Sequence, residues 1–130
     1  MWKENLPNDC PPETAEEIEE KVFRIVKDEE PTPDDFKPYA KLYPNNKRYK
    51  NLCRAYAVSF FDTLENATKA FLSAKTRNRC LGKYVVEYKM SKNFGCCEYK
   101  KESGHYSIWF YSNWNFNNFD PIRIIPINEN

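Results

Sequence analysis

Glycine is scarce in this sequence, with only three glycines among 130 residues. Gly82, Gly95 and Gly104 lie too far apart to form a phosphate-binding loop of the Gly-x-x-x-x-Gly-Lys type or the glycine-rich turn of a dinucleotide-binding fold. Kinases, P-loop ATPases and dehydrogenases of that fold are therefore excluded as functions of this chain.

Long apolar runs are also absent. No stretch reaches the roughly 18 apolar residues that a membrane-spanning helix needs, and the opening residues Met-Trp-Lys-Glu are not followed by the apolar core of a signal peptide. These absences predict a soluble, cytoplasmic protein.

The chain has one histidine, His105, and five cysteines with irregular spacing. An odd number of irregularly spaced cysteines is more typical of a reducing compartment than of a disulfide framework. No Cys-x-x-Cys pair occurs. Because Cys96 and Cys97 are adjacent, they should project to opposite faces of a strand, so we predict no metal site.

Aromatic residues are abundant, with nine Phe, nine Tyr and three Trp. Large rings favour strands and bury much area, so they predict a β-rich core. The length suits one domain. We expect an acidic lead-in over residues 1–20 and a single α+β domain over residues 21–130.

Charge is distributed unevenly along the chain. Residues 1–36 have four basic and twelve acidic side chains, whereas residues 37–130 have sixteen basic and seven acidic ones. The two parts can complement each other within the fold, or the basic part can face a phosphate-bearing ligand or nucleic acid.

Hydrophobic periodicity predicts a small, split, mainly antiparallel sheet of about six strands. The turn signal at residues 93–95 suggests that the third and fourth strands form a hairpin. The strands are expected over residues 22–27, 57–61, 83–90, 96–101, 106–111 and 122–127.

Two helices are expected. The main amphipathic helix should span residues 63–74, because Asp62 or Thr63 can cap it and four apolar residues share one stripe. Those residues are Leu64, Ala67, Phe71 and Ala74. A short N-terminal helix is expected over residues 13–20, where acids follow a double proline.

Arg24 lies in the first predicted strand, between Val22 and Val26 on one face. Such an arginine can extend to water from an edge strand, or it can bind an anion in a cleft. Ser59 occupies the middle of the next predicted strand, and His105 follows Gly104 just before the fifth. His105 can act as an acid or base near neutral pH, or donate to a phosphate.

This order of elements resembles the core of the ADP-ribosyltransferase-like fold. In that family a split sheet binds NAD through a first-strand Arg or His, a second-strand Ser and a later-strand Glu. The resemblance covers residues 22–127 and implies that Arg24 and Ser59 take the first two roles, with NAD as ligand. Where the family has its glutamate, this chain has Gly104 and His105.

Related RNA 2'-phosphotransferases use His and Arg instead, so the resemblance implies either a transferase acting through Arg24, Ser59 and His105 or a nucleotide-binding relative without catalysis. The chain is also similar to small uncharacterised bacterial proteins that share a Gly-His-Tyr turn, a resemblance that implies no activity.

Several further residues are candidates for ligand binding. Tyr106 and Trp109 can supply rings beside His105, or they can be core residues. Residues 41–54 form a basic, aromatic loop that includes Lys47, Arg48 and Tyr49 and contains no acid. This composition suits single-stranded nucleic acid or a nucleotide. It also suits a solvated loop without a ligand, or an inhibitory or accessory factor, of bacterial or phage type, that binds a protein partner.

Overall fold

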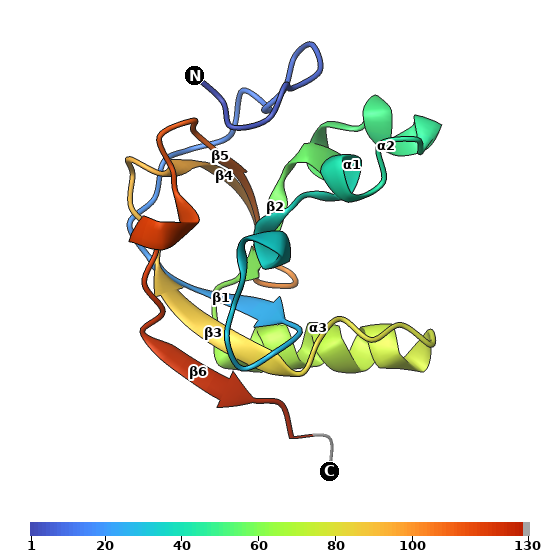
Figure 1. Ribbon diagram of the computed structural model, residues 1–130, viewed down its shortest axis with the longest axis vertical. Helices are drawn as coiled ribbons and strands as arrows, with labels where there is room; N and C mark the ends of the chain where they lie inside the picture. Colours follow the sequence, from blue (N-terminus) through green and yellow to red (C-terminus); the bar gives the residue numbers. More distant parts are fainter. Residues whose placement is uncertain (129–130) are drawn as a thin grey trace.

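Six strands pair into one antiparallel sheet with the order β4-β5-β2-β1-β3-β6, shown in Figure 1. The structure is a computed structural model that describes residues 1–128. The strands are β1 Lys21–Val26, β2 Val58–Phe61, β3 Tyr84–Lys89, β4 Gly95–Lys100, β5 His105–Phe110 and β6 Arg123–Pro126. The predicted α+β class with six strands is confirmed.

One long helix and several single turns complete the fold. These are the 3-10 turn η1 Pro33–Phe36, the helices α1 Tyr39–Leu42 and α2 Lys47–Lys50, the turn η2 Cys53–Tyr56, the helix α3 Leu64–Thr76 and the turn η3 Phe116–Asn118. None of the helices within residues 1–128 has the length and apolar character needed to cross a membrane.

Helix α3 forms where the sequence predicts the main helix. The Thr63 side chain caps it by accepting a hydrogen bond from the Asn66 N–H. Three members of the predicted stripe, Ala67, Phe71 and Ala74, are buried. They pack α3 against one face of the sheet, so α3 covers strands β1, β2 and β3 there.

The two faces of the sheet carry separate apolar clusters. Val22 and Val26 belong to the larger cluster, while Phe23 and Ile25 pack with α3. Strand β3 is buried on both faces, because Val85 and Glu87 are buried as well as Val86 and Tyr88. Val85 packs with the buried residues of α3.

The sheet separates between its two central strands. β1 and β2 share a single register pair, Phe23 with Phe61, whereas β1 pairs with β3 along its full length. The result is two three-stranded halves, β4-β5-β2 and β1-β3-β6, which lie one above the other in Figure 1. We call the boundary between β1 and β2 the seam.

The predicted hairpin between the third and fourth strands does not form. β4 pairs with β5, while β3 pairs with β1 and β6. The turn signal around residues 93–95 is real, but the chain there crosses from one half of the sheet to the other. The turn residues alone therefore predicted the wrong partner strand for β4.

The predicted N-terminal helix over residues 13–20 is also absent. Glu16 instead forms an isolated bridge with Cys97 on the edge strand β4, with N–H to carbonyl distances of 2.9 and 2.7 Å. The exposed backbone of an edge strand offers partners that a short acidic helix cannot match. Trp2 pairs in the same way with Tyr111, so the N-terminal segment lies along β4 and β5.

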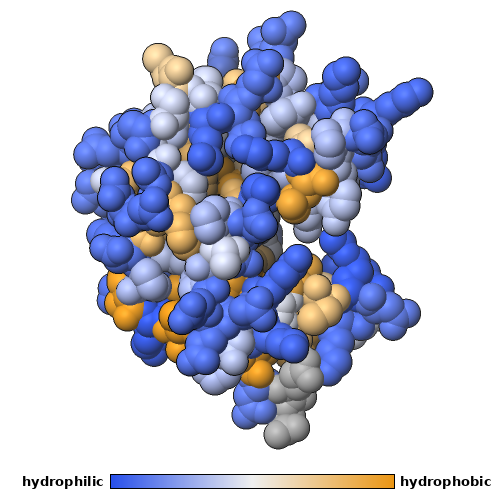
Figure 2. Space-filling view, viewed as in Figure 1, coloured by the Kyte–Doolittle hydropathy of each residue, from blue (hydrophilic) through white to orange (hydrophobic). Residues whose placement is uncertain are grey.

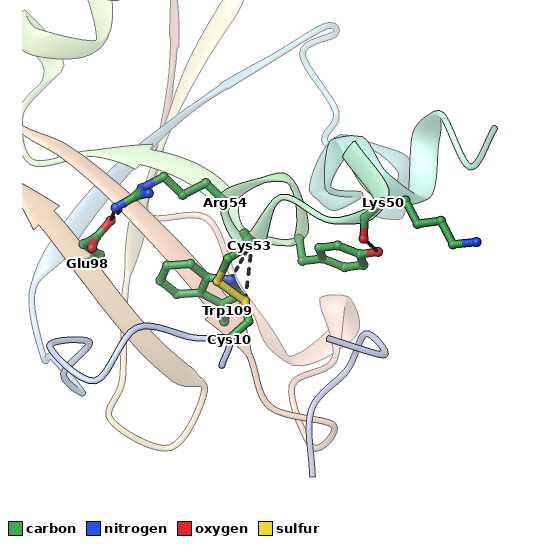
Figure 3. The surroundings of a disulfide bond; sticks show 7 residues. Cys10, Lys50, Cys53, Arg54, Glu98 and Trp109 are labelled. Atoms are coloured by element: carbon green, nitrogen blue, oxygen red, sulfur yellow. Dashed lines mark hydrogen bonds and ion pairs between the residues drawn. A yellow bond between two sulfur atoms is a disulfide. The ribbon is translucent and has the colours of Figure 1, made fainter. Parts of the chain in front are cut away.

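A disulfide bond joins Cys10 to Cys53, with a Cα to Cα distance of 5.5 Å (Figure 3). This finding corrects the inference from the cysteine count, which did not favour a disulfide framework. The remaining cysteines, Cys80, Cys96 and Cys97, are free. The disulfide attaches the N-terminal segment to η2, just before β2.

Candidate functional site

Ser59, predicted in the second strand, and His105, predicted just before the fifth, meet in the structure. The Ser59 hydroxyl lies 2.9 Å from His105 Nε2. β2 and β5 are antiparallel neighbours in which Phe61 faces His105 and Ser59 faces Ser107. Residues two apart on a strand share a face, so the register brings these two side chains together.

The environment of His105 favours the neutral form of its imidazole. Burial lowers the pKa of His105 from 6.5, and the positive charges of Lys100 and Arg24 lower it further. Glu98 acts in the opposite direction. A neutral imidazole can accept a proton from the Ser59 hydroxyl at the observed distance, which is the geometry of a hydroxyl and its general base.

Arg24 lies at the seam, and its side chain bonds to the backbone of η1 and of β2. Its Nε and Nη2 donate to the Asp35 carbonyl at 2.9 and 2.6 Å, and its Nη1 donates to the Ser59 carbonyl at 2.7 Å. The guanidinium also stacks over the rings of Phe36 and Phe60. Burial lowers the pKa of Arg24 to about 10, a value that leaves the side chain charged at pH 7.

β1 is a central strand, so Arg24 does not extend to water from an edge. Its side chain shares the sheet face of Val22 and Val26, whereas Ser59 and His105 lie on the opposite face. The three predicted residues therefore surround the seam from two sides. Arg24 bonds to the Ser59 backbone, and on the other face the Ser59 side chain is exposed while His105 is half-buried.

Tyr106 and Trp109 are buried. Tyr106 is 8% exposed and lies in the large core cluster, against the ring of Tyr99. Trp109 is 1% exposed, and its Nε1 donates to the Cys53 carbonyl at 3.1 Å. Their burial favours the alternative left open by the sequence, that these rings are core residues.

Lys47, Arg48 and Tyr49 form helix α2 rather than an irregular loop. Asn46 caps the helix by accepting from the Tyr49 N–H at 3.1 Å. The helix lies away from β5 in Figure 1, so these residues belong to a different surface from the Ser59–His105 pair.

Lys100 is a site residue that the sequence reasoning missed. It lies directly opposite His105 in the pairing of β4 with β5. The correct signal was the short turn between residues 100 and 105, which joins β4 and β5.

Gly104 fixes the start of β5. Its φ of +66° favours glycine, and a Cβ atom there would collide with the side chains of Asp62 and Asn66. Its carbonyl accepts from the Asp62 N–H at 2.9 Å. The strand therefore begins at a defined position against the start of α3, with His105 as its first residue.

The surface of the molecule is hollowed between two parts of the fold. Figure 2 shows a notch on the side where α1 and α2 face the end of α3. Arg79, which follows α3, donates to the Tyr39 hydroxyl at 3.4 Å and so reaches from one wall to the other. Two other hollows adjoin the N-terminal segment, and neither is lined by Ser59 or His105.

Comparisons of the chain with protein-family models, curated proteins and solved structures found no match.

Proposed function

We propose that the chain binds a nucleotide or an NAD-like dinucleotide at the seam, in the manner of an ADP-ribosyltransferase-like protein. The observation that carries this proposal is the meeting of Ser59 and His105 at 2.9 Å, beside the point where β1 and β2 separate. The split sheet, with arginine in β1, serine in β2 and a polar residue opening β5, supports the same arrangement.

Each residue has a distinct part in this proposal. The Ser59 hydroxyl is exposed and can bond to a ribose hydroxyl or a phosphate oxygen. Lys100 is exposed and unbonded to any acid within residues 1–128, so its ammonium group can pair with a phosphate. Arg24 is a positioning residue, because its hydrogen bonds fix the Ser59 backbone.

The role of His105 distinguishes a protein that only binds the nucleotide from one that also catalyses its reaction. The start of β5 has no glutamate, so a transferase reaction would depend on the neutral His105 imidazole as the proton acceptor. In the other form of the proposal, the protein has the same geometry and binds the nucleotide without turnover. Release of nicotinamide from NAD distinguishes the two forms.

Isothermal titration of the full chain with NAD, ADP-ribose and AMP tests the proposal. We expect saturable binding of at least one of the three, weakened about tenfold or more in His105→Ala and in Ser59→Ala. Lys92→Ala removes an exposed charge from the turn after β3 and should leave the affinity unchanged. Melting temperatures of all variants verify that the fold is intact.

Two results would overturn the proposal. One is the absence of saturable binding by all three ligands. The other is binding that survives unchanged in both site variants, which would place the ligand elsewhere on the molecule.

A further inference from the structure

Helices α1 and α2 carry a surface that the seam does not use. Three tyrosines gather there, with ring centroids 5.6 to 6.3 Å apart: Tyr39, Tyr43 and Tyr49. Tyr39 is 43% exposed and Tyr43 is 55% exposed. Neither helix contains a buried residue, so these rings do not serve a core beneath them.

The same surface has unbalanced positive charge. The sequence has no acid from residue 36 to residue 61. Lys47, Arg48 and Lys50 are exposed, and within residues 1–128 none of them forms an ion pair. Two nearby cations differ, because Lys41 pairs with Glu4 and Arg54 pairs with Glu98.

The surface is held in a fixed shape. The Tyr56 hydroxyl donates to the Lys50 carbonyl at 2.8 Å, which ties α2 to η2. η2 is joined in turn to the N-terminal segment through the Cys10–Cys53 disulfide. Figure 3 shows this anchoring, with Lys50, Cys53 and Cys10 on neighbouring segments. The rings and cations are therefore presented together.

We infer that this tyrosine surface, made of Tyr39, Tyr43, Tyr49, Lys47, Arg48 and Lys50, binds single-stranded nucleic acid. Exposed rings provide stacking faces for unpaired bases, and adjacent cations neutralise the phosphates. An acidic protein would pair with the cations, but the clustered rings would contribute less to its binding than to that of unpaired bases. The surface is distinct from the Ser59–His105 pair, so the inference does not depend on the proposed function.

Fluorescence anisotropy with a labelled 12-nucleotide oligouridylate tests the inference, measured with the full chain between 50 and 200 mM salt. We expect affinity to fall steeply as salt rises. Tyr43→Ala should weaken binding about tenfold, while Tyr43→Phe, which keeps the ring, should stay within about twofold of the unmodified chain. Lys47→Ala combined with Arg48→Ala should also reduce the slope of log affinity against log salt by about 1.4.

The matched control is Lys92→Ala combined with Lys101→Ala, which removes the same charge from turns outside this surface and should leave the slope unchanged. A polyglutamate peptide of equal charge is the competing probe. The inference is overturned if the oligonucleotide does not bind, if Tyr43→Ala has no effect, or if polyglutamate binds as tightly as the oligonucleotide.

Discussion

At the scale of single residues, the structure of the seam depends on the hydrogen bonds that its polar side chains form. Arg24 is an example, since its guanidinium donates across the seam to the Ser59 carbonyl of β2 and also to the Asp35 carbonyl of η1. A charged group in a mostly apolar setting is stable only when it is bonded, and here carbonyl oxygens of Asp35 and Ser59 supply the bonds. The arginine is thus part of the architecture of the site.

Replacement of Arg24 by methionine should destabilise the protein by about 3 kcal/mol, because two carbonyl oxygens lose charge-assisted hydrogen bonds. Urea denaturation measures the change. The matched control is Arg54→Met, which removes an ion pair with Glu98 from a half-exposed arginine and should cost less than about 1 kcal/mol. Equal effects of the two changes would contradict this role for Arg24.

The titration of His105 gives a direct test of the site's electrostatics. Since the chain has one histidine, its imidazole gives one pair of ring signals in an NMR titration. We expect a midpoint below 6.5, the ordinary value, because burial and the charges of Lys100 and Arg24 disfavour the imidazolium. Lys100→Ala should move the midpoint upward, whereas Lys92→Ala should not.

The sign of the effect on stability follows from the same shift. The unfolded chain takes up a proton on His105 at a higher pH than the folded chain does. The contribution of His105 to the free energy of unfolding is therefore fully present above about pH 6.5 and decreases as pH falls toward the folded pKa. A midpoint at or above 6.5 would show that the imidazole is more open to water than the structure indicates.

At the scale of elements, α3 is the helix whose packing fixes one side of the seam. Its buried stripe contacts β1 and β2 through a cluster that includes Phe23 and Phe61. Phe61 is also in ring contact with His105, with centroids 5.3 Å apart. Packing of the helix and placement of the histidine are therefore connected through one phenylalanine.

Phe71→Ala should destabilise the protein by about 3 to 5 kcal/mol, because Phe71 is 2% exposed and its loss leaves a cavity under α3. Leu72→Ala is the control from the same helix, since Leu72 is 43% exposed and should change stability by less than about 0.5 kcal/mol. Thermal and urea denaturation report both values. A small loss in Phe71→Ala would mean that α3 is not firmly packed on the sheet.

At the scale of the whole molecule, the N-terminal segment connects parts of the fold that lie far apart in sequence. It adds backbone bridges to β4 and β5 and carries the acid Glu4 to the basic α1. The charge asymmetry in the sequence is thus partly balanced within the fold. The Cys10–Cys53 disulfide makes the attachment covalent and encloses a long loop, with a sequence separation of 43.

Loss of this disulfide should lower stability by about 4 kcal/mol, because a loop of that length restricts the unfolded chain. Cys10→Ser combined with Cys53→Ser, or treatment with a phosphine reductant, tests this by urea denaturation. The untreated protein should show three titratable thiols when denatured, from Cys80, Cys96 and Cys97. Five thiols without reductant would contradict the disulfide.

Local patterns in the sequence determined much of the fold. Alternation gave the six strands to within about two residues, and the stripe of Ala67, Phe71 and Ala74 gave α3 and its buried face. These features depend on neighbours along the chain, whose geometry is fixed by the backbone repeat of a strand or a helix. Ser59 became a candidate through the resemblance to the ADP-ribosyltransferase-like fold, and His105 because it is the one histidine of the sequence and follows a glycine.

The partners of these elements were decided only by the tertiary structure. Strand pairing joins segments that lie far apart in sequence. β4 therefore pairs with β5 and not with β3, and Glu16 pairs with an edge strand instead of lying in a helix. The same holds for the burial of Trp109, the pairing of Cys10 with Cys53 and the 2.9 Å contact between Ser59 and His105. Each depends on which surfaces remain after the sheet is assembled, and no local pattern contains that information.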